Sequence, residues 1–232
     1  IDVAKKTKDR GYGPAYTLNS IGIVVDSLAG IEINSWEDLW KPELKGKIAI
    51  PDITTTNGPA ILSIAADKAG VPLESDNGKA AFKELEALKP NVVKTYSKSS
   101  DLANMFSSGE IVAAIAADFA FDTITNVKAE AKYVVPTSGT YLNFNTININ
   151  KNSKNKDLAY KFINYLLSEE VQLRAAENLG DSPVNKNVKL DESKIGNLTY
   201  GSIVESGKTL DYEFVNSKMN SWVDSWNRIM NQ

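Results

Sequence analysis

Short apolar runs alternate with amphipathic segments over most of the chain. The short runs predict buried strands, whereas apolar residues spaced three and four apart predict helices with one buried face. Because strands and helices follow one another in turn from residue 21 to residue 178, the pattern predicts an α/β fold. The expected strands are 21–25, 47–51, 92–96, 111–117, 132–135 and 142–149. The expected helices are 60–70, 77–89, 101–108, 119–130, 156–167, 169–178 and 210–232.

Residues that start and stop helices support several of these boundaries. Gly70 ends one expected helix and Gly180 follows another, and glycine is common at such positions because it adopts a positive φ without strain. Ser168 precedes the helix 169–178 and can accept a hydrogen bond from its first turn. Ser35 and Asp38 have the spacing of a capping box, which predicts a short helical turn.

Polar residues gather where the expected strands end. An open α/β sheet binds ligands outside the carboxyl ends of its strands. Here those ends are 51–57, 117–119 and the turn at 138–140. We therefore expect a binding site along that edge of the sheet.

The composition excludes several classes of function. The 232 residues include no cysteine and no histidine, which excludes thiol catalysis, histidine-based triads and Cys/His zinc sites. We expect no cofactor and no enzymatic activity. The net charge of −3 provides no excess of cations for a phosphate backbone, so nucleic acid is not an expected partner. The longest apolar run, 111–117, is too short to span a bilayer.

The first candidate site is the polar segment between the strand 47–51 and the helix that follows it. Hydroxyl and amide groups at a helix N-terminus form a recognition surface, and free helix N–H groups favour an anion or a carboxylate. The same residues are also consistent with an ordinary helix cap and turn. The candidates are Asp52, Thr54, Thr55, Thr56 and Asn57.

The segment 35–50, with the sequence SWEDLWKPELKGKIAI, resembles the part of extracellular solute-binding proteins of ABC importers where the chain enters their second lobe. It is most similar to the spermidine/putrescine-binding branch. The resemblance covers essentially the whole chain and implies a two-lobe, periplasmic-binding-protein-like fold of type II. Four later segments follow in the order and spacing of that family: 91–93, 105–113, 159–167 and 179–185.

The resemblance also implies how the chain is divided into lobes. Family members carry an N-terminal part of lobe 1 before the position of Ile1, so this chain resembles the C-terminal part of a binding protein. Trp222 and Trp226 are expected to seat the final helix on lobe 1. The expected division is 1–19 as the end of lobe 1 and a hinge, 20–140 as lobe 2, and 141–232 as the return hinge and the C-terminal part of lobe 1, with 186–209 as a segment that could contact lobe 2.

Further candidate residues come from the resemblance. The family often has an aromatic residue that walls the ligand at the position of Ala116, and Asp118 and Phe119 lie beside that position. Polyamine-binding members carry a tryptophan and an aspartate at the positions of Asn143 and Asn145, and the aspartate pairs with an ammonium group. Because asparagine carries no negative charge, these two residues depart from a typical spermidine site.

Tyr141 is a candidate aromatic contact, and Asp181 could restore one carboxylate to the cleft. Each candidate has a structural alternative: core packing for Phe119, amide pairing along an edge strand for the asparagines, and a solvated loop for Asp181. Asp52, Asp118 and Asp181 together suit an organic cation, whereas the threonine segment suits a carboxylate or a phosphonate. A zwitterion would satisfy both groups.

The function that the resemblance implies is capture of a small polar or cationic solute, polyamine-like or zwitterionic, between two lobes. The expected partners are that solute and the membrane permease of an ABC importer, and the protein is expected to be a monomer. The expected location is extracellular, at the cell surface or in the periplasm, with or without a lipid anchor. The alternatives are a ligand-sensing module of the same fold and a hydrolase that uses Asp52 and Asp118.

Overall fold

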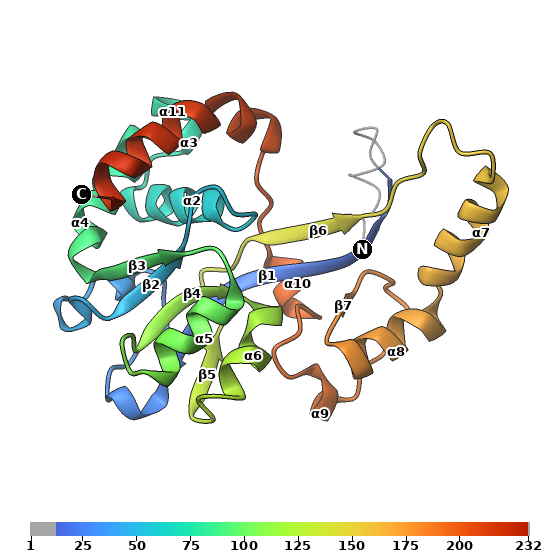
Figure 1. Ribbon diagram of the computed structural model, residues 1–232, viewed down its shortest axis with the longest axis horizontal. Helices are drawn as coiled ribbons and strands as arrows, with labels where there is room; N and C mark the ends of the chain where they lie inside the picture. Colours follow the sequence, from blue (N-terminus) through green and yellow to red (C-terminus); the bar gives the residue numbers. More distant parts are fainter. Residues whose placement is uncertain (1–12, 232) are drawn as a thin grey trace. The chain divides into compact units, whose positions relative to one another are not determined.

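The computed structural model describes residues 13–231. Helices and strands alternate through the first half of the chain, and helices dominate the second half (Figure 1). In chain order the elements are β1 (Ala15–Asp26), η1 (Ser27–Ala29), η2 (Glu37–Trp40), η3 (Pro42–Leu44), β2 (Ile48–Pro51), α2 (Gly58–Ala69), α3 (Leu73–Asp76), α4 (Lys79–Leu88), η4 (Lys89–Asn91), β3 (Val92–Tyr96), α5 (Ser99–Ser107), β4 (Ala113–Ala117), η5 (Asp118–Ala120), α6 (Phe121–Thr125), β5 (Ala131–Val134), β6 (Leu142–Thr146), α7 (Lys156–Leu166), α8 (Glu169–Leu179), β7 (Ser182–Pro183), α9 (Glu192–Ile195), α10 (Ser202–Ser206) and α11 (Tyr212–Met230).

The chain divides into two compact units. Unit 1 contains the residues up to Ser20 together with Leu142–Ser206, and unit 2 contains Ile21–Tyr141 together with Gly207–Gln232. The chain therefore passes between the units at three points: after Ser20, after Tyr141 and after Ser206. The first two points lie one residue from the expected boundaries, and the third was not expected.

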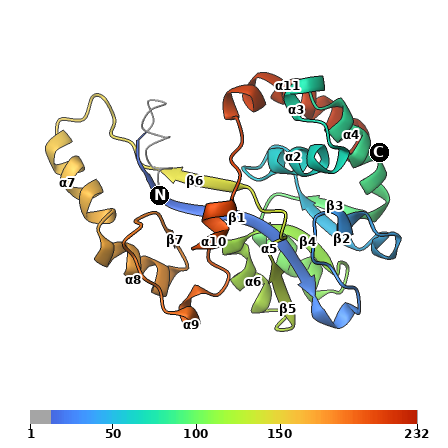
Figure 2. The same ribbon diagram turned by 180° about the vertical axis from the view of Figure 1, so that it is seen from behind.

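Unit 2 is built on a mixed sheet with the strand order β3-β2-β4-β1-β5. Strand β2 is parallel to β3 and β4, whereas β1 is antiparallel to β4 and β5. Alternate side chains face opposite sides of this sheet. Ile21 and Ile23 pack in one hydrophobic cluster with α2, α4 and α11, and Val24 packs in a second cluster with α5 and α6. Figures 1 and 2 show these helices on the two faces of the sheet, so unit 2 has three layers.

The final helix belongs to unit 2, which corrects the expectation that it seats on lobe 1. Trp222 and Trp226 are both buried in the larger cluster of unit 2. The Trp222 Nε1–H group donates to the carbonyl of Asn77 at 3.0 Å. Lys89 Nζ donates to the carbonyl of Met230 at 2.7 Å, near the end of the helix. The apolar face of α11 was correctly identified, but its packing partner is a segment more than a hundred residues earlier in the chain.

Unit 1 contains the first half of β1, the short strands β6 and β7, and the helices α7 to α10. Strands β6 and β7 both pair antiparallel with β1, with Ser20 opposite Leu142 and Leu18 opposite Ser182. Among residues 13–20 and 142–206, the hydrophobic cluster of this unit is small, with the buried members Ala15, Leu18, Leu142, Val184 and Val204.

Strand β1 is longer than the pattern predicts, because it begins at Ala15 and runs to Asp26. The resemblance places a hinge near residues 16–20. They are extended because β6 and β7 supply ladder hydrogen-bond partners from more than a hundred residues later in the chain. A local pattern does not reveal such partners.

The expected helix 119–130 is also wrong in length. The structure has a 3-10 turn at Asp118–Ala120 and a short helix, α6, that ends at Thr125. The next residues form a turn that leads into β5. Lys128 Nζ lies 2.8 Å from the carboxylate of Asp26, and the Ser27 hydroxyl donates to the carbonyl of Glu130 at 2.7 Å. These contacts with the end of β1 hold the segment as a turn.

Candidate functional site

Two of the candidate carboxylates lie at the same edge of the unit 2 sheet. Asp52 directly follows β2, and Asp118 directly follows β4. Because β2 and β4 are parallel neighbours, their carboxyl ends meet at one edge. Strand β1 enters unit 2 at that edge too, since Ile21 pairs with Ala117. The structure therefore brings the segment 52–57 and the residues 118–119 to one side of unit 2.

The loop after β2 is organised around the carboxylate of Asp52. Its Oδ1 accepts hydrogen bonds from the Thr54 backbone N–H at 3.0 Å and from the Thr54 hydroxyl at 2.6 Å. The Thr55 hydroxyl donates to the Asp52 carbonyl at 2.7 Å. Thr56 is exposed. The loop thus uses two of its three hydroxyls internally, and these bonds hold the carboxylate in place at the end of the strand.

The first residues of α2 do not offer the anion site that free helix N–H groups would provide. The Gly58 N–H donates to the Thr55 carbonyl at 3.1 Å, and the Ala60 N–H donates to the Asn57 carbonyl at 3.2 Å. Pro59, between them, has no N–H group. Two of the helix N–H donors that the expected carboxylate or phosphonate contact would use are therefore already paired.

Asp118 and Phe119 differ sharply in exposure. Asp118 is buried, and its Oδ1 accepts a hydrogen bond from the Phe119 backbone N–H at 2.7 Å. The Phe119 side chain is 56% exposed, so it is not part of the core. Phe121 instead packs on Tyr133, with ring centroids 5.7 Å apart. An exposed aromatic side chain beside a buried carboxylate can contact the apolar part of a ligand.

Tyr141 has a different environment from the other candidates. Its side chain is buried, and its hydroxyl donates to Asp67 Oδ2 at 2.7 Å. Burial and this hydrogen bond raise the pKa of Tyr141 well above its ordinary range, so the hydroxyl remains a protonated donor. The structure thus gives the Tyr141 hydroxyl an internal partner on α2.

Asn143 and Asn145 lie on one face of the β1/β6 ladder in unit 1. Asn143 pairs with Asn19, and Asn145 pairs with Thr17, in the register of the two strands. Asn145 Nδ2 donates to the Thr17 hydroxyl at 2.7 Å. Asn143 is buried, whereas Asn145 is exposed. The two asparagines predicted from the resemblance therefore belong to a row of four polar side chains.

Asn19 is a candidate that the sequence reasoning missed. Within residues 13–231, its Oδ1 atom is buried and accepts no hydrogen bond. An unpaired buried carbonyl oxygen is costly, so an N–H group that gained access to it would be favoured. The polar residues Thr17 and Asn19 on either side of Leu18 are a short strand-like alternation that could have identified this residue.

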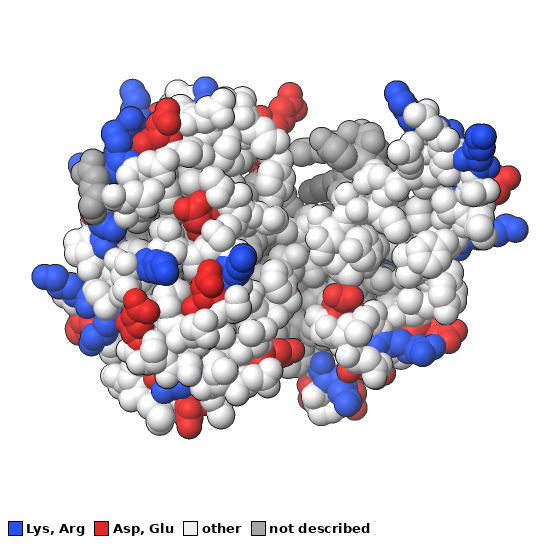
Figure 3. Space-filling view, viewed as in Figure 1, with Lys and Arg blue, Asp and Glu red and all other residues white. Residues whose placement is uncertain are grey.

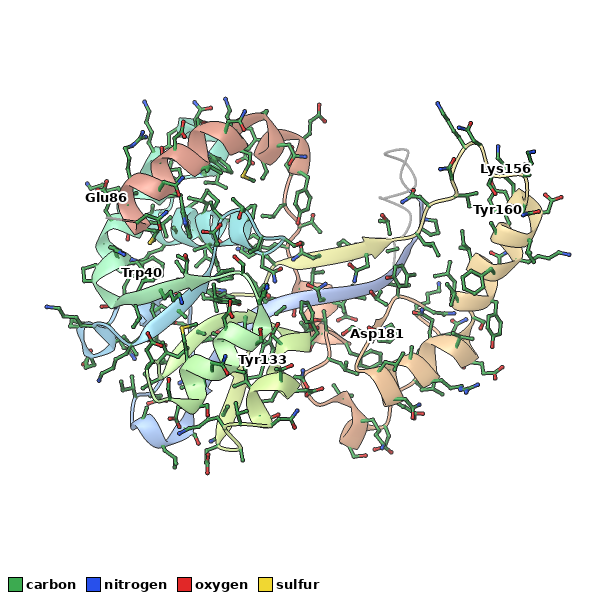
Figure 4. All side chains as sticks on the ribbon, viewed as in Figure 1. Trp40, Glu86, Tyr133, Lys156, Tyr160 and Asp181 are labelled. Atoms are coloured by element: carbon green, nitrogen blue, oxygen red, sulfur yellow. The ribbon has the colours of Figure 1, made fainter. Side chains whose placement is uncertain are left out.

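Asp181 follows Gly180, which ends α8 with a positive φ of 70°. Figure 4 labels Asp181 in the loop between α8 and β7. The carboxyl group is partly withdrawn from solvent, and this burial raises its pKa. In the part of the chain that the structure describes, no cation pairs with it. A cationic ligand would therefore lower that pKa.

The distribution of charge on the surface does not favour the binding of a polyanion. Figure 3 shows lysine and arginine side chains interspersed with aspartate and glutamate on the face that it displays. No group of three or more acidic residues among residues 13–231 is arranged to hold a metal ion. Of the helices described, none has both the length and the apolar character needed to cross a membrane.

Comparison with known proteins shows the family. The family described as bacterial extracellular solute-binding protein matches residues 2–197. The chain belongs to this family of solute-binding proteins. Its members are transport proteins and not enzymes.

Two relatives carry names that state what they bind. The chain is 30% identical over 164 residues to the spermidine/putrescine-binding periplasmic protein of Escherichia coli (strain K12), a match that covers 69% of this chain and 45% of the relative. It is 32% identical over 176 residues to the spermidine/putrescine-binding periplasmic protein 1 of Haemophilus influenzae, covering 73% of this chain and 47% of that protein. The chain therefore spans about half the length of these relatives.

A solved structure is considerably more similar. It is described as an ABC transporter from Clostridium perfringens ATCC 13124 and shares 73% sequence identity with this chain. The TM-score is 0.92, and the match covers 99% of this chain and 73% of that structure. The fold is the type II fold of periplasmic binding proteins, as the resemblance implied.

Proposed function

We propose that this protein captures a small organic amine for an ABC importer and acts outside the cytoplasmic membrane. The observation that carries this proposal is the pair of carboxylates, Asp52 and Asp118, at the carboxyl ends of two adjacent parallel strands. The names of the relatives, which are spermidine- and putrescine-binding proteins, support the same class of solute.

Three features favour a cation over an anion. The Gly58 and Ala60 N–H groups at the start of α2 are already paired, which removes two donors for an anion. The raised pKa of Asp181 indicates a carboxylate that lacks a cationic partner. The buried Oδ1 of Asn19 is an acceptor without a donor, and an ammonium group supplies only donors. Each of these features, within its own unit, favours the amine end of a solute.

The mechanism that we propose is capture by closure, without chemistry on the solute. An ammonium group would pair with the carboxylates, and the exposed ring of Phe119 would contact the methylene chain. Closure of two lobes removes water from these contacts, which strengthens them. The closed protein then delivers the solute to a membrane permease.

Isothermal titration of the complete gene product tests this proposal. The panel contains spermidine, putrescine, thiamine, aminoethylphosphonate and acetate. We expect binding of at least one amine and no binding of acetate. Binding of aminoethylphosphonate with no binding of the simple amines would restore the zwitterion alternative. Binding of acetate alone would contradict the proposal.

Substitutions then assign the contacts to residues. Asp52→Asn and Asp118→Asn remove a charge and keep the shape, so each should weaken amine binding by about ten- to a hundredfold. The control is Glu86→Gln on α4, an exposed acid labelled in Figure 4. The affinity of the Glu86→Gln variant for the amine should equal that of the unmodified protein. Equal losses in all three variants would indicate a general effect of net charge instead of specific contacts.

A further inference from the structure

The three points where the chain enters or leaves unit 2 are joined to one another by hydrogen bonds within that unit. The Ile21 N–H donates to the carbonyl of Tyr141 at 3.3 Å, and the Lys208 N–H donates to the carbonyl of Thr140 at 2.8 Å. The Thr140 hydroxyl also donates to the carbonyl of Ile21. We call Ile21, Thr140, Tyr141 and Lys208 the crossover cluster. Each of its members lies within two residues of a passage between units.

One carboxylate oxygen on α2 binds two side chains of the crossover cluster. Asp67 Oδ2 accepts the Tyr141 hydroxyl at 2.7 Å and lies 2.7 Å from Lys208 Nζ. Lys208 Nζ is also 5.6 Å from the centre of the Tyr141 ring. The ion pair is about half exposed, which makes it weak alone, and the hydrogen bond to the buried tyrosine is partly buried. Asp67 thus fastens two of the three crossovers to one helix.

The same helix carries the candidate loop at its other end. Helix α2 has 12 residues and begins immediately after the segment 52–57. A helix of this length is a rigid rod of about 18 Å. Its first turn follows Asp52 and the threonines, and its last turns carry Asp67. A change at the loop therefore has a direct mechanical connection to the crossover cluster.

We propose that Asp67 is a positioning residue for solute capture, which fixes the crossover cluster on α2 and so couples it to the candidate loop. The role of Asp67 in solute capture rests on the proposed function, whereas its contacts with Tyr141 and Lys208 do not. It also explains why Tyr141, an aromatic candidate from the sequence, has its hydroxyl directed to α2. A movement of unit 1 must pass through these crossovers, so their stiffness contributes to the free energy of closure.

The adjacent residue of α2 provides a matched control. Lys68 Nζ lies 3.2 Å from the carboxylate of Glu84 on α4, and that ion pair is less exposed than the one made by Asp67. It joins α2 to α4 and touches no member of the crossover cluster. Glu84→Gln therefore removes a comparable ion pair from the same helix without loosening the crossovers.

Amide hydrogen exchange of the complete gene product tests the geometry without any ligand. The amide of Ile21 is the monitor, because no substitution used here alters its sequence neighbours. Asp67→Asn and Tyr141→Phe should each accelerate its exchange by about three- to tenfold. Glu84→Gln should leave it unchanged. Unchanged exchange in Asp67→Asn, or an equal increase in Glu84→Gln, would overturn the proposal.

Titration with spermidine tests whether Asp67 contributes to solute capture. Asp67→Asn should weaken spermidine binding by about three- to tenfold, and Glu84→Gln should not. The double variant Asp67→Asn with Lys208→Gln should lose no more than the larger single variant, since both act through one contact. Unaltered affinity in Asp67→Asn would contradict a positioning role. If the unmodified protein binds none of the amines, the proposed function fails, while the exchange of Ile21 still decides whether Asp67 holds the crossovers.

Discussion

Unit 2 and unit 1 differ in how completely they bury their apolar residues. Unit 2 has two hydrophobic clusters, one on each face of its sheet, and they include the fully buried Trp226. The described residues of unit 1 form one small cluster around Leu18 and Val184. Its helix α7 leaves Tyr160, Phe162 and Tyr165 more than half exposed, and Figure 4 labels Tyr160 on that helix.

The difference teaches that buried apolar area stabilises unit 2 more than it stabilises the described part of unit 1. Buried apolar area is the main favourable term in folding, so unit 2 has what an independent domain needs. Helix α7 is amphipathic, but in the described chain much of its apolar face meets solvent. An apolar face that is exposed to solvent in this way contributes little to the free energy of folding. The following substitutions test this contrast, beginning with the largest expected effect.

Trp226→Ala should have the largest effect, because it empties a fully buried site in unit 2. The free energy of unfolding of unit 2 should fall by about 3–5 kcal/mol. Urea unfolding followed by tryptophan fluorescence measures it, since the three remaining tryptophans, Trp36, Trp40 and Trp222, also lie in unit 2. A loss below about 1 kcal/mol would mean that α11 does not pack as described.

Gly58→Ala should have the next largest effect. A Cβ atom on Gly58 would lie 2.3 Å from the Asp52 carbonyl oxygen and 2.4 Å from Ile53 Cα, so backbone would have to move. We expect a loss of about 2–3 kcal/mol in unit 2, again measured by fluorescence in urea.

Gly201→Ala in unit 1 is the matched control for Gly58→Ala. Gly201 has a φ of 58° and no atom within 4 Å of an added Cβ, so only the conformational cost of about 1 kcal/mol applies. Pulsed amide exchange in urea, read on the helices of unit 1, measures this variant. A larger loss for Gly201→Ala than for Gly58→Ala would reverse the contrast between the units.

Asp181→Asn should alter the pH dependence of unit 1. Burial raises the pKa of Asp181 above its ordinary value of 3.8 in the folded state. The carboxyl group therefore stabilises unit 1 fully below pH 3.8, and this contribution is lost as the pH rises through the raised folded pKa. Asparagine does not titrate, so the variant should lose less stability between pH 3 and pH 7.

The size of the Asp181 effect is small, under about 1 kcal/mol, because the side chain keeps partial access to solvent. Urea unfolding of α8, followed by pulsed amide exchange at the two pH values, measures it. Identical pH dependence in the variant and the unmodified protein would contradict the raised pKa. A steeper pH dependence in the variant would mean that the pKa of Asp181 is shifted in the opposite direction.

Phe162→Ser should have the smallest effect. Phe162 is 55% exposed on α7, so the free energy of unfolding of this chain should change by less than about 0.5 kcal/mol. Phe82→Ser on α4 is the control, because Phe82 is buried in unit 2 and should cost several times more. Amide exchange of α7 and tryptophan fluorescence of unit 2 give the two values. Equal losses would show that α7 is packed as tightly as α4.

Much of the candidate site in unit 2 could be predicted from the sequence. Asp52 and Asp118 were expected because polar residues follow two apolar runs, and the parallel pairing of β2 with β4 brings them to one edge. The neighbouring N–H groups were misjudged. Pro59 and the turn carbonyls of Thr55 and Asn57 satisfy or remove donors that a generic helix would leave free. Whether these residues bind a solute remains a prediction.

Local periodicity determined the α/β class, the positions of most strands and helices, and the left-handed glycines that end α2 and α8. These features depend on interactions within a few residues, which the sequence displays directly. Only the tertiary structure decided that α11 belongs to unit 2, that β1 begins at Ala15, and that Asp67 binds Tyr141 and Lys208. An apolar face or a carboxylate specifies that it needs a partner. The identity of that partner depends on the packing of segments that lie far apart in the chain.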